Sequence, residues 1–214
     1  MKIVQIVKKN DKKVFVHFDN DEKIVLSKDL VYQNGLRKSD EISEEQLKNL
    51  LEQEKKINIK QKALALLGRR AHSKRELFNK LRRHSSDTKL IEECLSDLEQ
   101  KGLIDDKIFA TLYTQDKIRW KKWGRPKIKI ELFKRGVTKE IINEVIENFF
   151  DSNLEKEKIL ELVRKKLNQF KGKITDKKII YQKLMYYLLS KGYDIELVID
   201  ILKKELNFDE EESI

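Results

Sequence analysis

Apolar residues recur at helical spacing through most of the chain after residue 57. Leu81 is followed ten residues later by Ile91, and then by Cys94 and Leu95. The same offsets lead from Leu132 to Ile142, Val145 and Ile146, and from Leu188 to Val198, Ile201 and Leu202. A helix–turn–helix pattern that recurs roughly every 50 residues predicts tandem helical repeats. One unit alone buries little apolar surface, so the units must stack on one another.

The first 27 residues follow a different pattern. KIVQIV, VFVHF and KIVL are short segments rich in β-branched residues, separated by the turn-prone KNDKK and DNDE. They predict an antiparallel sheet of three strands, with hairpins at Asn10-Asp11 and Asn20-Asp21. Such a sheet is marginal alone and must pack against a helix. A short helix follows from Ser27 and stops at Gly35.

Capping residues and breakers divide the rest into helices. Ser43 with Gln46 forms a capping box for the helix 44–56, and we expect a separate helix to begin at Ile57. Ser73 with Glu76 predicts a second capping box. A long helix over 106–122 ends where Trp123-Gly124-Arg125-Pro126 breaks it, with Pro126 early in the next helix. The remaining helices are expected to have their caps at Asp87 or Thr88, at Thr138, and at Thr175 or Asp176.

These elements predict a mainly α protein with three tandem three-helix repeats and a small N-terminal antiparallel β region. We expect an N-terminal region over 1–56 and repeats over 57–104, 105–152 and 153–208. An acidic tail, 209–214, follows.

Positive charge is concentrated in one part of the chain. The net charge is +10, and residues 60–135 hold 21 Lys and Arg against 10 Asp and Glu. The segments before and after are nearly neutral, at +1 and −2. A surplus confined to the first repeat and the front of the second indicates a surface that contacts a polyanion. The alternative is that these lysines only keep the helices soluble.

Targeting signals and membrane segments are not evident. No stretch approaches the roughly 20 apolar residues that span a bilayer, and the N-terminus lacks the features of a signal peptide. The single cysteine, Cys94, cannot form an internal disulfide. We therefore expect a cytoplasmic protein.

Three motifs, SKRELFNKL at 73–81, DDKIFA at 105–110 and GRPKIKIELFKRGV at 124–137, resemble those of the RecX family of recombinase regulators. Residues 73–81, SKRELFNKL, resemble its S-x-x-E-L-x-x-K-L, and residues 105–110, DDKIFA, resemble its D-D-x-x-F-A. Residues 124–137, GRPKIKIELFKRGV, are similar to its G-x-x-x-I-x-x-x-L-x-x-K-G-[IV]. The order and spacing also match, and the resemblance covers about residues 57–205.

The resemblance implies a fold and a function. It implies three three-helix units in an elongated, curved molecule that lies along the groove of the RecA–DNA filament. It also implies that the chain modulates RecA in DNA repair and recombination, usually as an inhibitor, and that it binds DNA. We expect a monomer that contacts the RecA filament and single- and double-stranded DNA largely independently of sequence.

Catalytic and cofactor chemistry find little support. Asp105 and Asp106 are adjacent at a helix start, where they are expected to cap the helix rather than bind metal. Cys94 lies at an apolar position and is expected to be buried rather than reactive. The three histidines share no ligand spacing, and no phosphate-binding glycine loop occurs. We expect no cofactor, no metal and no enzymatic activity.

The candidate binding residues lie in basic clusters at helix ends and turns, where lysine and arginine can neutralise phosphates. They are Arg69, Arg70, Lys74, Arg75, Arg82, Arg83, Arg119, Trp120, Lys121, Lys122, Trp123, Arg125 and Lys127. Each tryptophan can stack on a base or partner, or instead anchor the turn in the core. Two other functions stay open: a sequence-specific helix-turn-helix transcription regulator, and a protein scaffold without affinity for nucleic acid.

Overall fold

A computed structural model describes residues 1–207 and confirms the mainly α fold with a small antiparallel sheet. The predicted acidic tail at 209–214 lies outside the described residues. The elements run β1 (Ile3–Lys8), β2 (Lys13–Phe18), β3 (Lys23–Ser27), α1 (Lys28–Gln33), α2 (Glu44–Leu67), α3 (Lys74–Leu81), α4 (Thr88–Gln100), α5 (Asp106–Asp116), α6 (Arg125–Lys134), α7 (Lys139–Phe149), α8 (Ser152–Phe170), α9 (Lys177–Lys191) and α10 (Ile195–Leu206).

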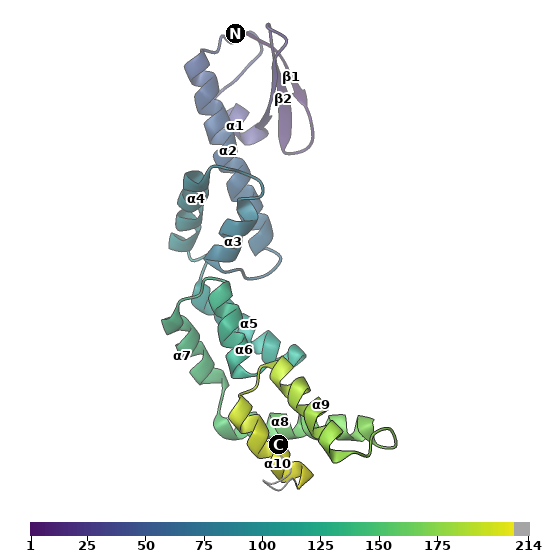
Figure 1. Ribbon diagram of the computed structural model, residues 1–214. Helices are drawn as coiled ribbons and strands as arrows, with labels where there is room; N and C mark the ends of the chain where they lie inside the picture. The colour runs from purple at the N-terminus through teal and green to yellow at the C-terminus, as the bar shows by residue number, and fades with distance from the viewer. Residues whose placement is uncertain (208–214) are drawn as a thin grey trace. The chain divides into compact units, whose positions relative to one another are not determined.

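The N-terminal sheet has the order β1-β2-β3, and both hairpins turn at the predicted Asn-Asp pairs. Alternate residues of β2 (Val14, Val16 and Phe18) are buried, as expected for a sheet with one covered face. Helices α1 and α2 lie beside this sheet (Figure 1). The buried Glu54 of α2 accepts a hydrogen bond from the Ser27 N–H at 2.6 Å and pairs with Lys13 at 3.3 Å.

The predicted separation of two helices at Ile57 is wrong, because α2 runs without a break from Glu44 to Leu67. No glycine or proline lies between its capping box at Ser43 and Gly68, so nothing in the backbone interrupts it. Its first half buries Leu50 with the sheet, and its second half buries Ile59 and Ala63. One helix thus belongs to both the N-terminal core and the first repeat.

The chain divides into two compact units. The first comprises Met1–Arg70 with Leu77–Leu103, and the second comprises Ala71–Glu76 with Ile104–Ile214, described to residue 207. The second unit contains two three-helix sets, α5–α7 and α8–α10. The short segment Ala71–Glu76 packs with the second unit although α3 continues beyond it.

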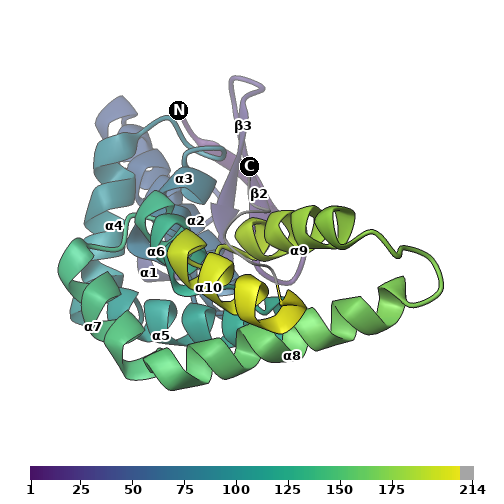
Figure 2. The same ribbon diagram turned by 60° about the horizontal axis from the view of Figure 1, so that its bottom comes forward.

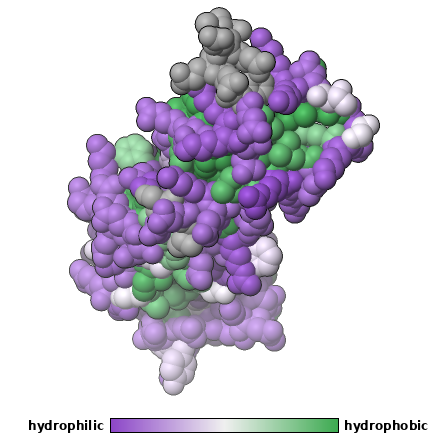
Figure 3. Space-filling model, turned by 90° about the horizontal axis from the view of Figure 1, so that it is seen from below, coloured by the Kyte–Doolittle hydropathy of each residue, from purple (hydrophilic) through white to green (hydrophobic). Residues whose placement is uncertain are grey.

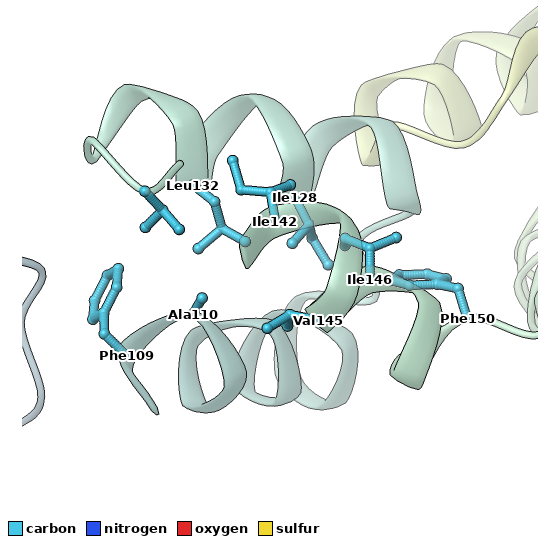
Figure 4. Packing of buried hydrophobic residues seen from close by; sticks show 9 residues of the cluster. Phe109, Ala110, Ile128, Leu132, Ile142, Val145, Ile146 and Phe150 are labelled. Carbon is cyan, nitrogen blue, oxygen red and sulfur yellow. The ribbon is translucent and has the colours of Figure 1, made fainter. Parts of the chain in front are cut away.

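The α5–α7 set encloses a continuous apolar core (Figure 4). Phe109 and Ala110 come from α5, Ile128 and Leu132 from α6, and α7 adds Ile142, Val145 and Ile146, with Phe150 directly after it. In α8–α10, which lie side by side in Figure 2, the equivalent core contains Leu184, Leu188, Val198, Ile201 and Leu202. The offsets that revealed the repeats are therefore core positions.

The surface of the chain is strongly polar. Hydrophilic residues cover most of the face drawn in Figure 3, and apolar residues show in a strip between them. This agrees with a chain of which 39% is charged.

Successive helix sets are joined by hydrogen bonds between corresponding positions at two places in the second unit. Ser73 Oγ donates to the carbonyl oxygen of Arg135 at 2.6 Å, and the Gly124 N–H donates to the carbonyl oxygen of Lys191 at 3.0 Å. Ser73 and Gly124 both directly precede the middle helix of a repeat. Arg135 and Lys191 both directly precede the left-handed glycine that ends the next middle helix.

A carboxylate also accepts a backbone hydrogen bond at the corresponding position of each of these two places. The backbone N–H of Lys74 donates to Asp106 Oδ1 at 2.8 Å, and that of Arg125 donates to Glu155 Oε1 at 3.5 Å. Each acid lies in the first turn of the next repeat and accepts a hydrogen bond from an N–H in the first turn of another helix. N–H groups in a first turn have no acceptor within their own helix. We call these two sets of contacts the Ser73 junction and the Gly124 junction.

Candidate nucleic-acid interface

The basic stretch after α5 continues that helix as a π-helical turn and not as an α-helix. The predicted helix over 106–122 is α-helical only to Asp116, after which Lys117–Lys121 form a π-helical turn. Lys122 ends the turn with φ of 52°, a left-handed conformation that is uncommon outside glycine. The wider turn and the reversal at Lys122 bring the backbone to Gly124 at the junction with the next repeat.

The two tryptophans of this turn have different surroundings. Trp123 is half-buried and packs against the α5–α7 core, with the ammonium groups of Lys117 and Lys127 at 5.4 and 4.8 Å from its ring. Trp120 is 70% exposed, and the guanidinium of Arg119 lies 5.0 Å from its ring. Trp123 is therefore an anchor of the turn, whereas Trp120 presents an open aromatic face.

Two glycines permit the close approach at the Gly124 junction. A Cβ on Gly124 would lie 2.4 Å from the Gly192 carbonyl oxygen, and a Cβ on Gly192 would lie 2.1 Å from the Cβ of Lys127. Gly192 also has φ of 80°, which disfavours any side chain. Only glycine at both positions lets the end of α9 pack on the first turn of α6.

That approach gathers four lysines from different elements, Lys121, Lys127, Lys166 and Lys191, which we call the lysine cluster. Lys127 Nζ donates to the Ser190 carbonyl at 2.5 Å, and Lys191 Nζ donates to the Lys121 carbonyl at 3.1 Å. Lys166 and Lys191 lie 4.8 and 5.5 Å from the ring of Tyr187.

In the described part of the chain, no carboxylate neutralises the lysine cluster. Among residues 1–207, none of its four ammonium groups forms an ion pair with Asp or Glu. Partial burial lowers the pKa of Lys191, and the charges of Lys127, Lys121 and Lys166 lower it further. Within residues 1–207, these four cations lie near one another, next to backbone carbonyls and aromatic rings, and such a group forms a site for an external anion. The exposed ring of Trp120 on the same turn adds a surface on which a base can stack.

Comparisons with known proteins identify the family. Models of the first, second and third three-helix domains of RecX match residues 60–98, 105–146 and 155–202. The regulatory protein RecX of Clostridioides difficile is 34% identical over 203 residues, which cover 95% of this chain and 94% of that protein. The chain belongs to the RecX family. It is therefore a regulatory protein and not an enzyme.

Other RecX proteins are similar to this chain in length or in fold. The regulatory protein RecX of Clostridium beijerinckii is 32% identical, with 96% of this chain and 95% of that protein covered. A crystal structure of regulatory protein RecX aligns with a TM-score of 0.66 at 20% identity, covering 95% of this chain and 98% of that one. The structure of RecX from Lactobacillus salivarius aligns with a TM-score of 0.60 at 25% identity over 71% of this chain and 96% of that one.

The RecX motifs are largely structural in this chain. Asp105 caps α5 by accepting from the Lys107 and Ile108 N–H groups at 2.7 and 2.9 Å, while Asp106 holds the start of α3. Ser73 accepts from the Glu76 N–H at 3.1 Å. The second carboxylate of the D-D motif therefore joins one repeat to the next, a role that local sequence could not reveal.

Three of the predicted basic residues, Lys74, Arg75 and Arg125, lie at the two junctions of the second unit. The Arg125 guanidinium pairs with the buried Glu155 at 3.4 Å and lies 5.6 Å from the Phe150 ring. Lys74 is half-buried at the Ser73 junction, and the side chain of Arg75 lies against Gly136. Arg125 in particular joins α6 to α8, which leaves Lys121, Lys122, Lys127, Arg119 and Trp120 as the surface group.

The remaining predicted residues lie in the first unit. Arg69, Arg70, Arg82 and Arg83 are exposed at the ends of α2 and α3, and Arg82 lies 5.9 Å from the Phe78 ring. Their common edge with the second repeat stays a prediction, as do the repeat boundaries and the curved shape.

Sequence reasoning missed Lys166, Lys191 and Tyr187. One signal was available for Lys191, because it directly precedes the turn glycine of its repeat, as Arg135 does. Lys166 lies in the middle of α8, and only the folded chain brings it to this place.

Other candidate chemistry is weak. Within residues 1–207, no group of three or more His, Cys, Asp or Glu side chains is arranged to hold a metal ion. None of the helices in the same range is long and apolar enough to cross a membrane. Cys94 is half-buried, and burial raises the pKa of its thiol, which favours the less reactive protonated form.

Proposed function

We propose that this RecX-family chain binds the RecA–DNA filament and inhibits its recombinase and ATPase activities, with the lysine cluster on the DNA backbone. The observation that carries the proposal is the set of four lysines that have no carboxylate partner among residues 1–207. Lysines on a solvated surface commonly alternate with acids, whereas these are brought together by two glycines and left without neutralisation. Such a site gains free energy when an anion arrives.

A phosphodiester backbone fits the cluster better than a single small anion does. The cations come from four elements: Lys121 from the π-turn, Lys127 from α6, Lys166 from α8 and Lys191 from α9. Phosphates repeat along a strand, so several cations can be neutralised at once with release of counterions. Lysine contacts to phosphates carry no sequence information, so binding through the cluster is expected to be independent of sequence.

Inhibition follows from occupancy of the filament. A chain bound to the DNA and to RecA protomers hinders entry of the second duplex or the motions coupled to ATP turnover. Weak contacts by successive repeats add through effective concentration. The proposal includes a monomeric protein that acts in the cytoplasm.

The test reverses charge in the lysine cluster. We expect the triple variant Lys121→Glu, Lys166→Glu, Lys191→Glu to need on the order of tenfold more protein to inhibit RecA ATPase and strand exchange. The matched control is Lys12→Glu, Lys38→Glu, Lys48→Glu, which makes the same charge change at exposed lysines of the N-terminal region. Circular dichroism establishes that both variants are folded.

Two results would refute the assignment. One is equal inhibition by wild type and by the folded cluster variant. The other is equal loss in both triple variants, since that would make net charge, rather than the lysine cluster, the cause. If the cluster variant lost DNA binding but still inhibited RecA, the essential contact would be with the recombinase protein and not with DNA.

A further inference from the structure

Helix α6 carries apolar residues on two sides. Ile128 and Leu132 point into the core of the α5–α7 set (Figure 4). Ile130 and Phe133 lie on another side of the same helix and are 55% and 59% exposed. Single exposed apolar residues are ordinary, but a helix that is apolar on two sides is expected to be covered on both.

The exposed pair lines a defined hollow. Ile130 and Phe133 from α6, with Ile142 from α7, form the apolar part of a hollow of about 370 Å³. Residues three apart on a helix are neighbours on its surface, so both side chains face the same space. The hollow is large enough to take one or two apolar side chains of another molecule.

The rim of the hollow is positive. Lys129 and Lys134 from α6 and Lys139 from α7 line it together with Asn143, and no Asp or Glu does. Lys129 Nζ donates to Asn143 Oδ1 at 3.2 Å, which places an ammonium group between the two helices. An apolar centre surrounded by three ammonium groups is complementary to a partner segment whose apolar side chains are flanked by carboxylates.

The nearest acids do not neutralise this rim completely. Glu131 pairs with Arg135 at 2.6 Å and with Lys134 at 3.2 Å, so its charge is shared with an arginine outside the hollow. The carboxylate of Glu140 hydrogen-bonds its own backbone and Thr138 at the start of α7, which lowers its pKa. Lys129 and Lys139 form no ion pair within residues 1–207.

We propose that this hollow, between α6 and α7, binds an acidic segment of a partner protein that inserts apolar side chains between Ile130 and Phe133. Nucleic acid fits the hollow less well, because a phosphate backbone would leave the apolar floor uncovered. The proposal is independent of DNA binding by the lysine cluster, which consists of other residues.

The probe is a set of fluorescent 14-residue synthetic peptides. Each carries two leucines three or four residues apart with four flanking glutamates, and fluorescence polarisation reports binding to the full chain. We expect at least one register to bind. Serine in place of the leucines, or lysine in place of the glutamates, should abolish that binding.

Variants of the chain locate the site. Phe133→Ser and Ile130→Ser should each weaken the peptide about tenfold, since buried apolar anchors dominate such interfaces. Ile108→Ser is the matched control, because Ile108 on α5 is also 55% exposed and should change nothing. Lys139→Glu should weaken binding several-fold, and added salt should reduce the difference.

The proposal is overturned if no peptide binds wild type more tightly than Phe133→Ser, or if Ile108→Ser has the same effect as Ile130→Ser. It is also overturned if Phe133→Ser weakens the binding of single-stranded DNA and leaves the binding of the peptides unchanged. The Lys166→Glu, Lys191→Glu variant should retain peptide binding, so failure here is distinguishable from failure of the proposed DNA contact.

Discussion

The Ser73 junction and the Gly124 junction have the same backbone plan but opposite electrostatics. At the first, the arginine before the turn glycine, Arg135, pairs with Glu76 at 3.2 Å and Glu131 at 2.6 Å and lies 4.6 Å from the Tyr113 ring. At the second, Lys191 occupies the same place and faces three other lysines. One repeated position thus serves structure in one copy, and we propose that it serves binding in the other.

The difference shows that clustered basic sequence does not by itself mark an interface. The segment 124–137 contains five cations, one more than the lysine cluster, yet Arg125 and Arg135 are bound to carboxylates of the same molecule. A cation neutralised within the fold contributes packing and has little attraction left for a phosphate. A cation without such a partner retains that attraction.

The largest expected effect is a break in the Gly124 junction. Gly192→Ala should cost about 3 kcal/mol of unfolding free energy, from a side chain at φ of 80° and a clash with Lys127. Gly35→Ala is the control, because Gly35 has φ of 63° but nothing within 4 Å of an added Cβ, and it should cost about 1 kcal/mol. Urea unfolding measures both; equal costs would mean that the close approach is absent.

The two tryptophans should separate stability from binding. Trp123→Ala should cost about 2–3 kcal/mol, because it empties a space against the α5–α7 core. Trp120→Ala should change stability by less than about 0.5 kcal/mol. It should instead weaken single-stranded DNA binding by about 1–3 kcal/mol if a base stacks there. Thermal unfolding and polarisation on both variants test this, and a stability loss for Trp120→Ala would contradict it.

Removal of the equivalent cation at each junction sharpens the comparison. Arg135→Met should cost about 1–2 kcal/mol, since Glu76 and Glu131 lose a partner in a partly buried place. Lys191→Met should leave stability unchanged or slightly higher, because burial and neighbouring lysines already lower the pKa of that ammonium group. Chemical denaturation of both variants measures the two changes in unfolding free energy. Similar losses of stability at Arg135 and Lys191 would contradict the proposed difference between the two junctions.

The smallest effect is on the acid side of the stability profile. The hydrogen bond from Arg135, helped by Lys134, lowers the pKa of Glu131 below its ordinary value of 4.5. That stabilisation is complete above the unfolded-state pKa and disappears as pH falls through the folded-state pKa. In Arg135→Met, therefore, the decrease in Tm from about pH 6 to pH 3 should be shallower than in wild type. Parallel profiles would show that the pair contributes nothing.

Much of the fold followed from local sequence. The core offsets, the hairpins, Ser43 and Asp105 as caps, and the turn glycines all act within a few residues of themselves. The continuous α2 was missed because the change of pattern at Ile57 marks a change of packing partner and not a break in the backbone.

The candidate site depended on contacts that local sequence does not encode. Glu155 is 30 residues from Arg125, and Lys191 is 70 residues from the carbonyl of Lys121 that it meets. Whether a lysine is neutralised, and whether a tryptophan is covered, is decided by such distant partners. Charge density pointed to residues 60–135, and only the folded chain separated the structural Arg125 and Arg135 from the lysines of the cluster.

The central claim is tested most directly by the salt dependence of single-stranded DNA binding. We expect wild type to show a log–log slope that becomes shallower by about 1.4 in Lys166→Gln, Lys191→Gln, because two phosphate contacts are lost at about 0.7 each. The control Lys12→Gln, Lys38→Gln should keep the wild-type slope. An unchanged slope in the cluster variant, or an equal change in the control, would contradict the account.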